Sequence, residues 1–217
     1  MQMDASTESR RSYHSPRRQQ QARLTRSAIL DAALALFVER GYLATSLADI
    51  AQAAGVALTT VQAVFGTKPK LLAALWDVTI AGDDEAIPVA DRAWFQEMLQ
   101  EPDPRRQLEL HARNSRRVKH RAGALMEVIH RAAQADPEIG ERWRVMQDEF
   151  LENQALVVES LATKGALRPE VDVRQVAETL WTLNHPSLYH LLVHERGWSE
   201  ERYEQWLADA FVHQLLR

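Results

Sequence analysis

The sequence predicts an all-α protein in which a three-helix domain with a helix-turn-helix precedes a larger helical domain. Apolar residues recur at helical spacing along most of the chain, and no stretch shows the alternating pattern of a strand. Residues 47–65 are typical of two short helices joined by a glycine turn. Hydrophobic residues make up 46% of the chain and charged residues 26%, as in ordinary folded domains.

Residues 1–22 are rich in Ser, Arg and Gln, and we predict a disordered basic arm there. Thr25 is the predicted N-cap of a first helix over residues 26–40, because a threonine hydroxyl can accept a hydrogen bond from a free N–H of the first turn. Gly41 is expected to end this helix, since glycine is the usual residue past a helix C-terminus.

The helix-turn-helix follows. Its first helix presents one apolar face, made by Leu47, Ile50, Ala51 and Ala54. We predict that Thr45 and Ser46 cap this helix and that Asp49 completes a capping box. Gly55 ends it in the left-handed conformation that glycine readily adopts. The predicted buried side of the second helix consists of Val61, Val64 and Phe65.

The opposite side of the second helix is uncharged and is not needed for a core. It consists of Leu58, Thr59, Gln62 and Ala63. A glutamine amide can form a bidentate pair with adenine, and aliphatic groups can contact the thymine methyl group. We therefore predict that these four residues read bases in the major groove of an A·T-containing half-site.

The charge distribution supports a contact with phosphates. The net charge is −4, but residues 1–26 hold six arginines and two acidic residues, so this segment carries +4 and the remainder −8. The predicted phosphate contacts are Arg23, Arg26, Thr45, Ser46, Thr60 and Lys68. The alternatives are a solvated arm for the arginines, a simple helix cap at Thr45 and a surface lysine at Lys68.

Thr67 is the predicted cap of the next helix, and Gly82, three acidic residues and Pro88 mark a loop beyond it. Further helices are predicted over residues 92–99, 105–119, 122–135, 137–163, 173–195 and 199–216. Pro186 is expected to kink the fifth of these. The predicted division is an arm at 1–22, a helix-turn-helix domain at 23–67 and a helical domain at 68–217.

The last two helices have wide apolar faces, which make them candidates for a homodimer interface. The candidate residues are Leu180, Leu183, Leu188, Leu191, Trp206, Ala210 and Phe211. The alternative is that these residues close the core of the monomer.

A Gly-Tyr turn, a threonine cap, the segment IAQAAGV and the pattern F-x-x-K-x-x-L occur together in residues 24–76. In this combination and spacing the segment resembles the N-terminal domain of the TetR family of transcriptional regulators. The resemblance implies a dimeric regulator, a repressor, that binds an inverted repeat in double-stranded DNA. The chain departs from the family at Gln62 and Val64, where Tyr and His are usual, and at Leu58, so no phosphate contact is assigned to Val64.

The resemblance also implies a small-molecule effector held inside the C-terminal domain, which would release the DNA by a population shift. Candidate pocket residues are Trp94, Met126, His130, Trp143, Met146, Trp181, Asn184 and His185. The alternative is that the apolar members are plain core. Asn184 and His185, next to Pro186, are the expected polar groups of the pocket.

Two other functions stay open. One is an adaptor of the same fold without DNA binding, suggested by Gln62 and Val64. The other is a metal-dependent enzyme, suggested by His190 and His194 at i, i+4 beside Glu195. The chain has no cysteine, phosphate-binding loop or nucleophile elbow, so we expect no enzyme, cofactor or resident metal. No apolar run approaches the ~20 residues of a membrane span, and the N-terminus does not resemble a secretory signal, so we expect a cytoplasmic protein.

Overall fold

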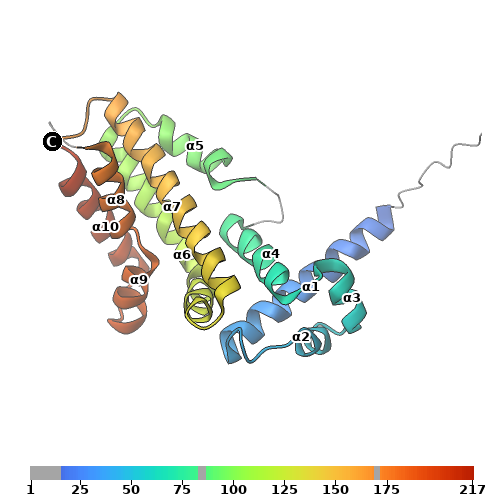
Figure 1. The fold of residues 1–217 in the computed structure, drawn as a ribbon. Coiled ribbons are helices and arrows are strands. Elements are labelled where there is room, and N and C mark those ends of the chain that lie inside the picture. Colours follow the sequence, from blue (N-terminus) through green and yellow to red (C-terminus); the bar gives the residue numbers. More distant parts are fainter. Residues whose placement is uncertain (1–15, 83–86, 169–171) are drawn as a thin grey trace, which may run out of the picture.

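The computed structural model describes residues 16–82, 87–168 and 172–217, and within these ranges the fold is all-α, as predicted (Figure 1). The helices are α1 (Pro16–Arg40), α2 (Leu47–Ala53), α3 (Leu58–Phe65), α4 (Lys68–Ala81), η1 (Val89–Asp91), α5 (Ala93–Gln100), α6 (Pro104–Ala133), α7 (Pro137–Thr163), α8 (Val173–Leu183), α9 (Pro186–Tyr189), η2 (His190–Glu195) and α10 (Glu200–Leu215). In this part of the chain no single helix is long and apolar enough to cross a membrane, and α2 and α3 meet that test only as a pair bent by 111°.

Helix α1 begins ten residues earlier than predicted. It starts at Pro16, so residues 16–22 are helical rather than a disordered arm, and Thr25 lies inside the helix instead of capping it. Proline suits the first turn of a helix, and the Arg, Gln and Ala residues that follow it are good helix formers. Residues 1–15 of the predicted arm lie outside the described residues.

Two predicted helix boundaries in the C-terminal part also differ. The segments expected over 105–119 and 122–135 form the single helix α6, because Gly123 alone does not stop a helix. The segment expected over 173–195 is interrupted at Asn184, and α9 starts anew at Pro186. Proline cannot donate the hydrogen bond that would continue α8, so the expected kink is a full break.

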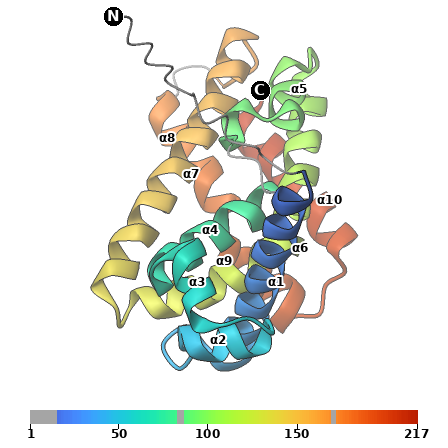
Figure 2. The ribbon, with the colours of Figure 1, turned by 90° about the vertical axis from the view of Figure 1, so that its right-hand side faces the viewer.

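Helices α1 to α4 form one end of the molecule, and α5 to α10 form a bundle at the other (Figure 1). In the bundle, α6 and α7 are the long central pair, α8 packs on α7, and α10 packs on α6. Figure 2 views the molecule from the end that carries α1, α2 and α3, which lie in front of the bundle. The start of α1 projects beyond α2 and α3 (Figure 1).

The hydrophobic core of the N-terminal end continues into the helical bundle. Its buried residues from α1 to α4 share one cluster with Leu125 and Ile129 of α6 and Ile139 of α7. Helix α4 contributes Leu71, Leu72 and Leu75 to this cluster. We call it the shared core, because it joins the helix-turn-helix to the bundle by apolar contact rather than by a linker.

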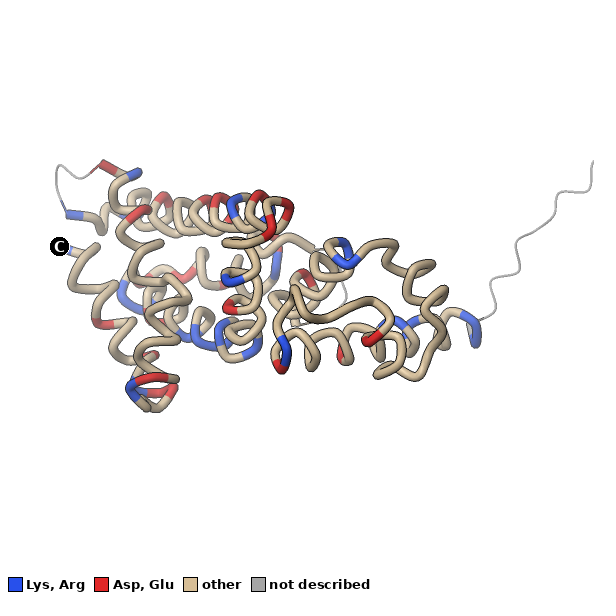
Figure 3. Tube along the Cα trace, turned by 60° about the horizontal axis from the view of Figure 1, so that its bottom comes forward, with Lys and Arg blue, Asp and Glu red and all other residues tan. Residues whose placement is uncertain are grey.

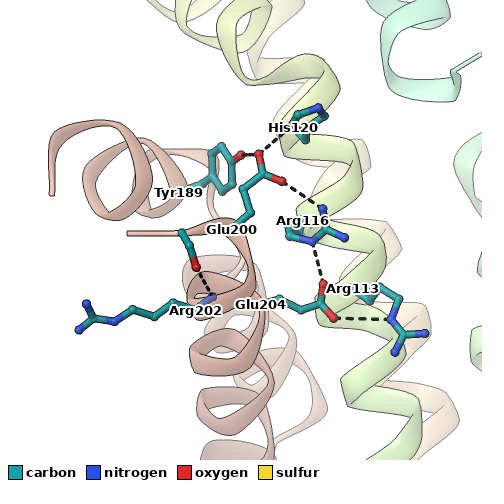
Figure 4. Close-up of polar contacts among 8 residues, drawn as sticks. Arg113, Arg116, His120, Tyr189, Glu200, Arg202 and Glu204 are labelled. Atoms are coloured by element: carbon teal, nitrogen blue, oxygen red, sulfur yellow. Dashed lines mark hydrogen bonds and ion pairs between the residues drawn. The ribbon is translucent and has the colours of Figure 1, made fainter. Parts of the chain in front are cut away.

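A polar network fixes α10 against α6 (Figure 4). Arg116 of α6 donates hydrogen bonds to Glu204 at 2.7 Å and to Glu200 at 3.0 Å. Glu200 also accepts a hydrogen bond from the Tyr189 hydroxyl at 2.9 Å and pairs with His120 at 2.6 Å. Burial opposes the ionisation of Glu200, but its hydrogen bonds with His120, Tyr189 and Arg116 outweigh burial and lower its pKa.

Replacing Arg116 with methionine should destabilise the protein by about 1–2 kcal/mol, since two partly buried carboxylates lose their shared partner while solvent still screens them. Chemical denaturation at neutral pH measures this change. The matched control is Arg117→Met, at an exposed neighbour on α6, which should shift the free energy of unfolding by less than about 0.5 kcal/mol. Equal effects of the two substitutions would contradict the prediction.

Candidate DNA-binding surface and interior cavity

The helix-turn-helix has the geometry that the sequence predicts. Ser46 is the N-cap of α2: its hydroxyl accepts from the Asp49 N–H at 3.1 Å, and the Asp49 carboxylate accepts from the Ser46 N–H at 2.8 Å. The hydrogen bonds from Ser46 lower the pKa of Asp49. Gly55 has φ +67° in the turn, and α3 leaves α2 at a bend of 111°.

The predicted base-reading face of α3 is exposed. Val61 and Phe65 point into the shared core, whereas Thr59, Gln62 and Ala63 are exposed and Leu58 is 39% exposed. Val64, which we predicted to be buried, is 40% exposed. Val61 and Phe65 are one helical turn apart and face the shared core. Val64 lies on a neighbouring face of α3, beside the row that these two residues form. Helix α3 therefore offers an uncharged outer face with two aliphatic side chains on it.

Basic residues lie beside this face. In Figure 3 they mark the start of α1, at the end of the molecule far from the C-terminus. Arg23 is exposed on α1, and Thr60 is half-buried on α3. The guanidinium of Arg26 lies 4.8 Å from the centroid of the Phe65 ring, a cation–π contact that holds it near the end of α3.

Two of the predicted phosphate contacts, the buried Thr45 and the exposed Ser46, have side chains that hydrogen-bond to other groups of the chain. Thr45 is 1% exposed, and its hydroxyl donates to the Gly41 carbonyl at 2.8 Å, so the predicted contact of this side chain with a phosphate is wrong. The reason is that the turn after α1 folds back and needs a donor for its carbonyl groups. The Ser46 hydroxyl and N–H both bond to Asp49, which takes the place at the start of α2 where we expected a phosphate.

Lys68 ties the start of α4 to the segment between α1 and α2. Its ammonium donates to the Tyr42 and Thr45 carbonyls, each at 3.0 Å, and lies 4.2 Å from the centroid of the Tyr42 ring. Burial lowers the pKa of Lys68. An ammonium has three N–H groups, so one is left for a phosphate. A phosphate contact of Lys68 stays a prediction.

A cavity of about 140 Å³ lies among α4, α5, α6, α7 and the junction of α8 and α9. Five of the predicted pocket residues line it: Trp94, Met126, Trp143, Met146 and Asn184. The other three do not. His130 and His185 line an adjoining groove of about 640 Å³ between α6, α9, η2 and the end of α1, which shares Met126, Trp143 and Pro186 with the cavity. Trp181 lines neither. For His185 the break at Pro186 is the reason, because the His185 side chain caps α9 instead.

The interior end of the cavity is polar. His111 Nε2 lies 2.8 Å from Gln154 Oε1, and the Asn184 amide donates to the same oxygen at 3.3 Å. Lys119 donates to Asn184 Oδ1. Burial lowers the pKa of His111 to about 4 and that of Lys119 to about 7. His111 is therefore neutral at pH 7.

Sequence reasoning missed His111, Lys119 and Gln154. A signal was available on α6, because His111, Ser115 and Lys119 recur every four residues within the apolar stripe that includes Leu108 and Ala122. Polar residues in a buried stripe need partners and so point to an interior site. No comparable periodicity marks Gln154.

Two residues of the predicted dimer interface belong to the monomer's own core. Leu180 of α8 and Phe211 of α10 are fully buried within the chain, because α8 turns its apolar face to α7 and α10 turns its own to α6. The remaining candidates keep some exposure, and the largest exposed fraction is the 44% of Leu191. These are Leu183, Leu188, Leu191, Trp206 and Ala210.

His190 and His194, the histidines considered as metal ligands, lie close to each other and to Glu195. The His190 and His194 ring centroids are 5.5 Å apart, and His190 Nε2 lies 3.5 Å from Glu195 Oε1. Within residues 16–82, 87–168 and 172–217 no group of three or more His, Cys, Asp or Glu side chains is placed to hold a metal ion.

Comparisons with known proteins agree with this geometry. Residues 29–75 match the model of the bacterial regulatory proteins of the tetR family. The chain is 29% identical over 171 residues to the probable HTH-type transcriptional regulator ArpR of Pseudomonas putida, covering 76% of this chain and 79% of that protein. It is 34% identical over 113 residues to the HTH-type transcriptional regulator AcrR of Shigella flexneri, covering about half of each chain.

Solved structures share the fold over most of the chain. NalD of Pseudomonas aeruginosa has a TM-score of 0.70 at 23% identity, covering 91% of this chain and 98% of NalD. SmeT, in its complex with triclosan, has a TM-score of 0.68 at 20% identity, covering 89% of this chain and 92% of SmeT. With a helix-turn-helix that matches the family model and a fold that matches along its length, this chain is a TetR-like DNA-binding transcriptional regulator.

Proposed function

We propose that the protein is a repressor that binds an inverted-repeat operator as a homodimer and releases it when a small molecule enters the interior cavity. The observation that carries this proposal is the exposed, uncharged face of α3 beside the basic start of α1. Phosphate contacts from Arg23 and Arg26 would position the helix, and Gln62 with its aliphatic neighbours would read the bases. This division of labour favours a regulator over an adaptor that does not bind DNA.

The cavity supports release by an effector. Trp76 and Ile80 of α4 line the cavity, while Leu71 and Leu72 of the same helix pack in the shared core with α3. A ligand in the cavity therefore contacts a helix that also supports the recognition helix. Among the similar structures, SmeT is in complex with triclosan, and a regulator from Saccharomonospora viridis is in complex with choline. A population shift needs only that the ligand bind one conformer better than the other.

Dimerisation is proposed through α8, η2 and α10. Leu183, Leu188, Leu191, Trp206 and Ala210 keep exposed area on these helices. A two-fold axis through this region would relate two copies of α3 and would account for an inverted repeat. We propose a cytoplasmic location, where the operator DNA of a bacterial regulator lies.

Selection of bound sequences from random duplex DNA by the full chain tests the proposed function. The expected product is an inverted repeat whose half-sites contain A·T pairs, bound in a salt-dependent way. Analytical ultracentrifugation of the complex should show two chains per operator. Recovery of unrelated sequences, or binding that does not respond to salt, would contradict operator recognition and favour the adaptor.

Replacing Gln62 with alanine should relax the preference at one base pair of each half-site. The loss of a bidentate contact is worth about 1–3 kcal/mol, a loss of discrimination there of about fivefold to 150-fold. Competition binding with operators that vary at single positions measures the change. Gln100→Ala, at an exposed glutamine of α5, is the matched control. An equal loss of affinity for every operator variant would show that Gln62 contacts the DNA backbone rather than a base.

A further inference from the structure

The interior cavity holds a buried ammonium without an acidic partner. Lys119 is 4% exposed, and its ammonium donates to Asn184 Oδ1 and lies 5.7 Å from the centroid of the Tyr203 ring. Within the described part of the chain, no carboxylate forms an ion pair with it. An amide oxygen and a ring face are weak substitutes for an anion in a low-dielectric interior.

A buried cation of this kind is costly for a free protein. Buried charges are usually paired or hydrogen-bonded on all sides, and replacing them with apolar side chains is often neutral or stabilising. His111, which shares the polar end of the cavity, is held neutral and supplies no negative charge. Glu149 lies in the lining, but it is exposed, so water screens its charge. The polar end of the cavity thus holds a cation for which the described residues supply no paired anion.

The rest of the cavity selects for an aromatic group. Its lining is rich in aromatic side chains, namely Trp76, Trp94, Phe95, Trp143 and Phe150. Its volume of about 140 Å³ is close to that of an engineered apolar cavity of ~150 Å³ that binds benzene. Edge-to-face and offset contacts with these rings favour a flat aromatic ligand over an aliphatic chain. One ring with a small head group is the size that fits.

A second polar atom in the lining has no partner. Gln147 Oε1 is buried and accepts no hydrogen bond within the described residues. Buried polar atoms in folded proteins almost always have a partner, and exceptions mark places where a ligand or water belongs. Gln147 Oε1 is an acceptor and calls for a donor from a ligand or water, so it does not bear on the anion that Lys119 calls for.

We propose that the cavity binds a monocyclic aromatic carboxylate, with the carboxylate accepting hydrogen bonds from Lys119 and the ring among the cavity's aromatic side chains. This inference rests on the proposed function of the cavity as the effector site and names the chemical class of the effector. Two N–H groups of the Lys119 ammonium remain for the carboxylate while the third stays on Asn184. The charge-assisted hydrogen bonds and the desolvated setting make the carboxylate the distinguishing group.

Benzoate, benzamide and benzylamine are the probes, since they share one ring and differ in charge. Titration calorimetry and tryptophan fluorescence of the full chain measure binding, because Trp76, Trp94 and Trp143 line the cavity. Benzoate should bind, and benzamide and benzylamine should bind at least about tenfold more weakly. Equal affinity for benzoate and benzamide, or no binding of benzoate at millimolar concentration, would overturn the proposal.

Lys119→Met tests the assigned residue. It should lower benzoate affinity at least about tenfold and leave benzamide affinity unchanged within about threefold. The matched control is Lys164→Met, which removes an ammonium bonded to the Leu99 and Glu101 carbonyls outside the cavity and should leave benzoate binding unchanged. Circular dichroism confirms that each variant is folded. Unchanged benzoate binding by folded Lys119→Met would also overturn the proposal.

Operator binding separates this inference from the proposed function. If the protein binds its selected operator but not benzoate, the ligand class is wrong and the repressor stands. If it binds benzoate as described but no operator, the cavity assignment stands and the repressor does not.

Discussion

Replacing Lys119 with methionine is expected to make the free protein more stable at neutral pH, and the gain should shrink as the pH rises. Burial lowers the pKa of Lys119 to about 7, whereas a lysine in the unfolded chain has a pKa of about 10.4. Between pH 7 and 10 the unfolded state therefore binds more protons than the folded state, so the stability of the wild-type protein rises with pH in this window. The variant has no lysine at this position and lacks this rise in stability, which is on the order of 4 kcal/mol between pH 7 and 10.

The groups that face Lys119 do not reproduce this pH dependence. Burial lowers the pKa values of His111 and His185 below the window and raises that of Tyr203 above it, and Asn184 does not titrate. Denaturant unfolding of both proteins at pH 7, 8, 9 and 10 measures the difference. Lys70→Met, at an exposed lysine of α4, is the control and should change stability by less than about 0.5 kcal/mol. A difference between Lys119→Met and wild type that stays constant across these pH values would show that the pKa of Lys119 is the same in the folded and the unfolded protein, so that burial does not lower it.

Replacing Leu72 with alanine is expected to cost about 2–5 kcal/mol of stability and to weaken the whole molecule rather than one end of it. Leu72 is 1% exposed in the shared core, where α4 meets residues of α1, α6 and α7. Because that core joins the helix-turn-helix to the bundle, we expect one cooperative unfolding transition, shifted to lower denaturant concentration.

The exchange protection of two helices, one at each end of the molecule, distinguishes a single unfolding transition from two. Hydrogen exchange followed by mass spectrometry should show α3 and α6 losing protection together in Leu72→Ala. Leu43→Ala, at a leucine that is exposed in the turn before α2, is the control and should have little effect. Loss of protection confined to α1–α4 would show that the two ends unfold independently.

The features that the sequence predicts well are local. The capping box of Ser46 and Asp49, the turn at Gly55 and the exposed face of α3 depend on residues within one or two helical turns. Local rules are reliable there because the side chain and its backbone partner are neighbours in the chain.

The features that the sequence does not predict depend on packing between distant segments. Thr45 is buried because the turn after α1 folds over it, and no neighbouring residue signals this. Leu180 and Phe211 lie on apolar faces that suit a partner subunit or the monomer equally well, and only the positions of α6 and α7 decide between the two. The family resemblance implies the pocket, and five of the eight candidate residues line the cavity, but Lys119 is not predicted there because a lysine is normally expected at the surface.

The shared core has a mechanical consequence. Since α4 is one unbroken helix of 14 residues, it is about 21 Å long, and its last turn borders the cavity while its first turn meets the end of α3. Leu71, Leu72 and Leu75 lie about 7 Å along the helix from its first residue, so a tilt of about 15° around them would displace that end by about 2 Å, enough to spoil the register of a base contact. The proposed release of DNA therefore needs no flexible hinge, because a stiff helix that pivots on packed leucines suffices.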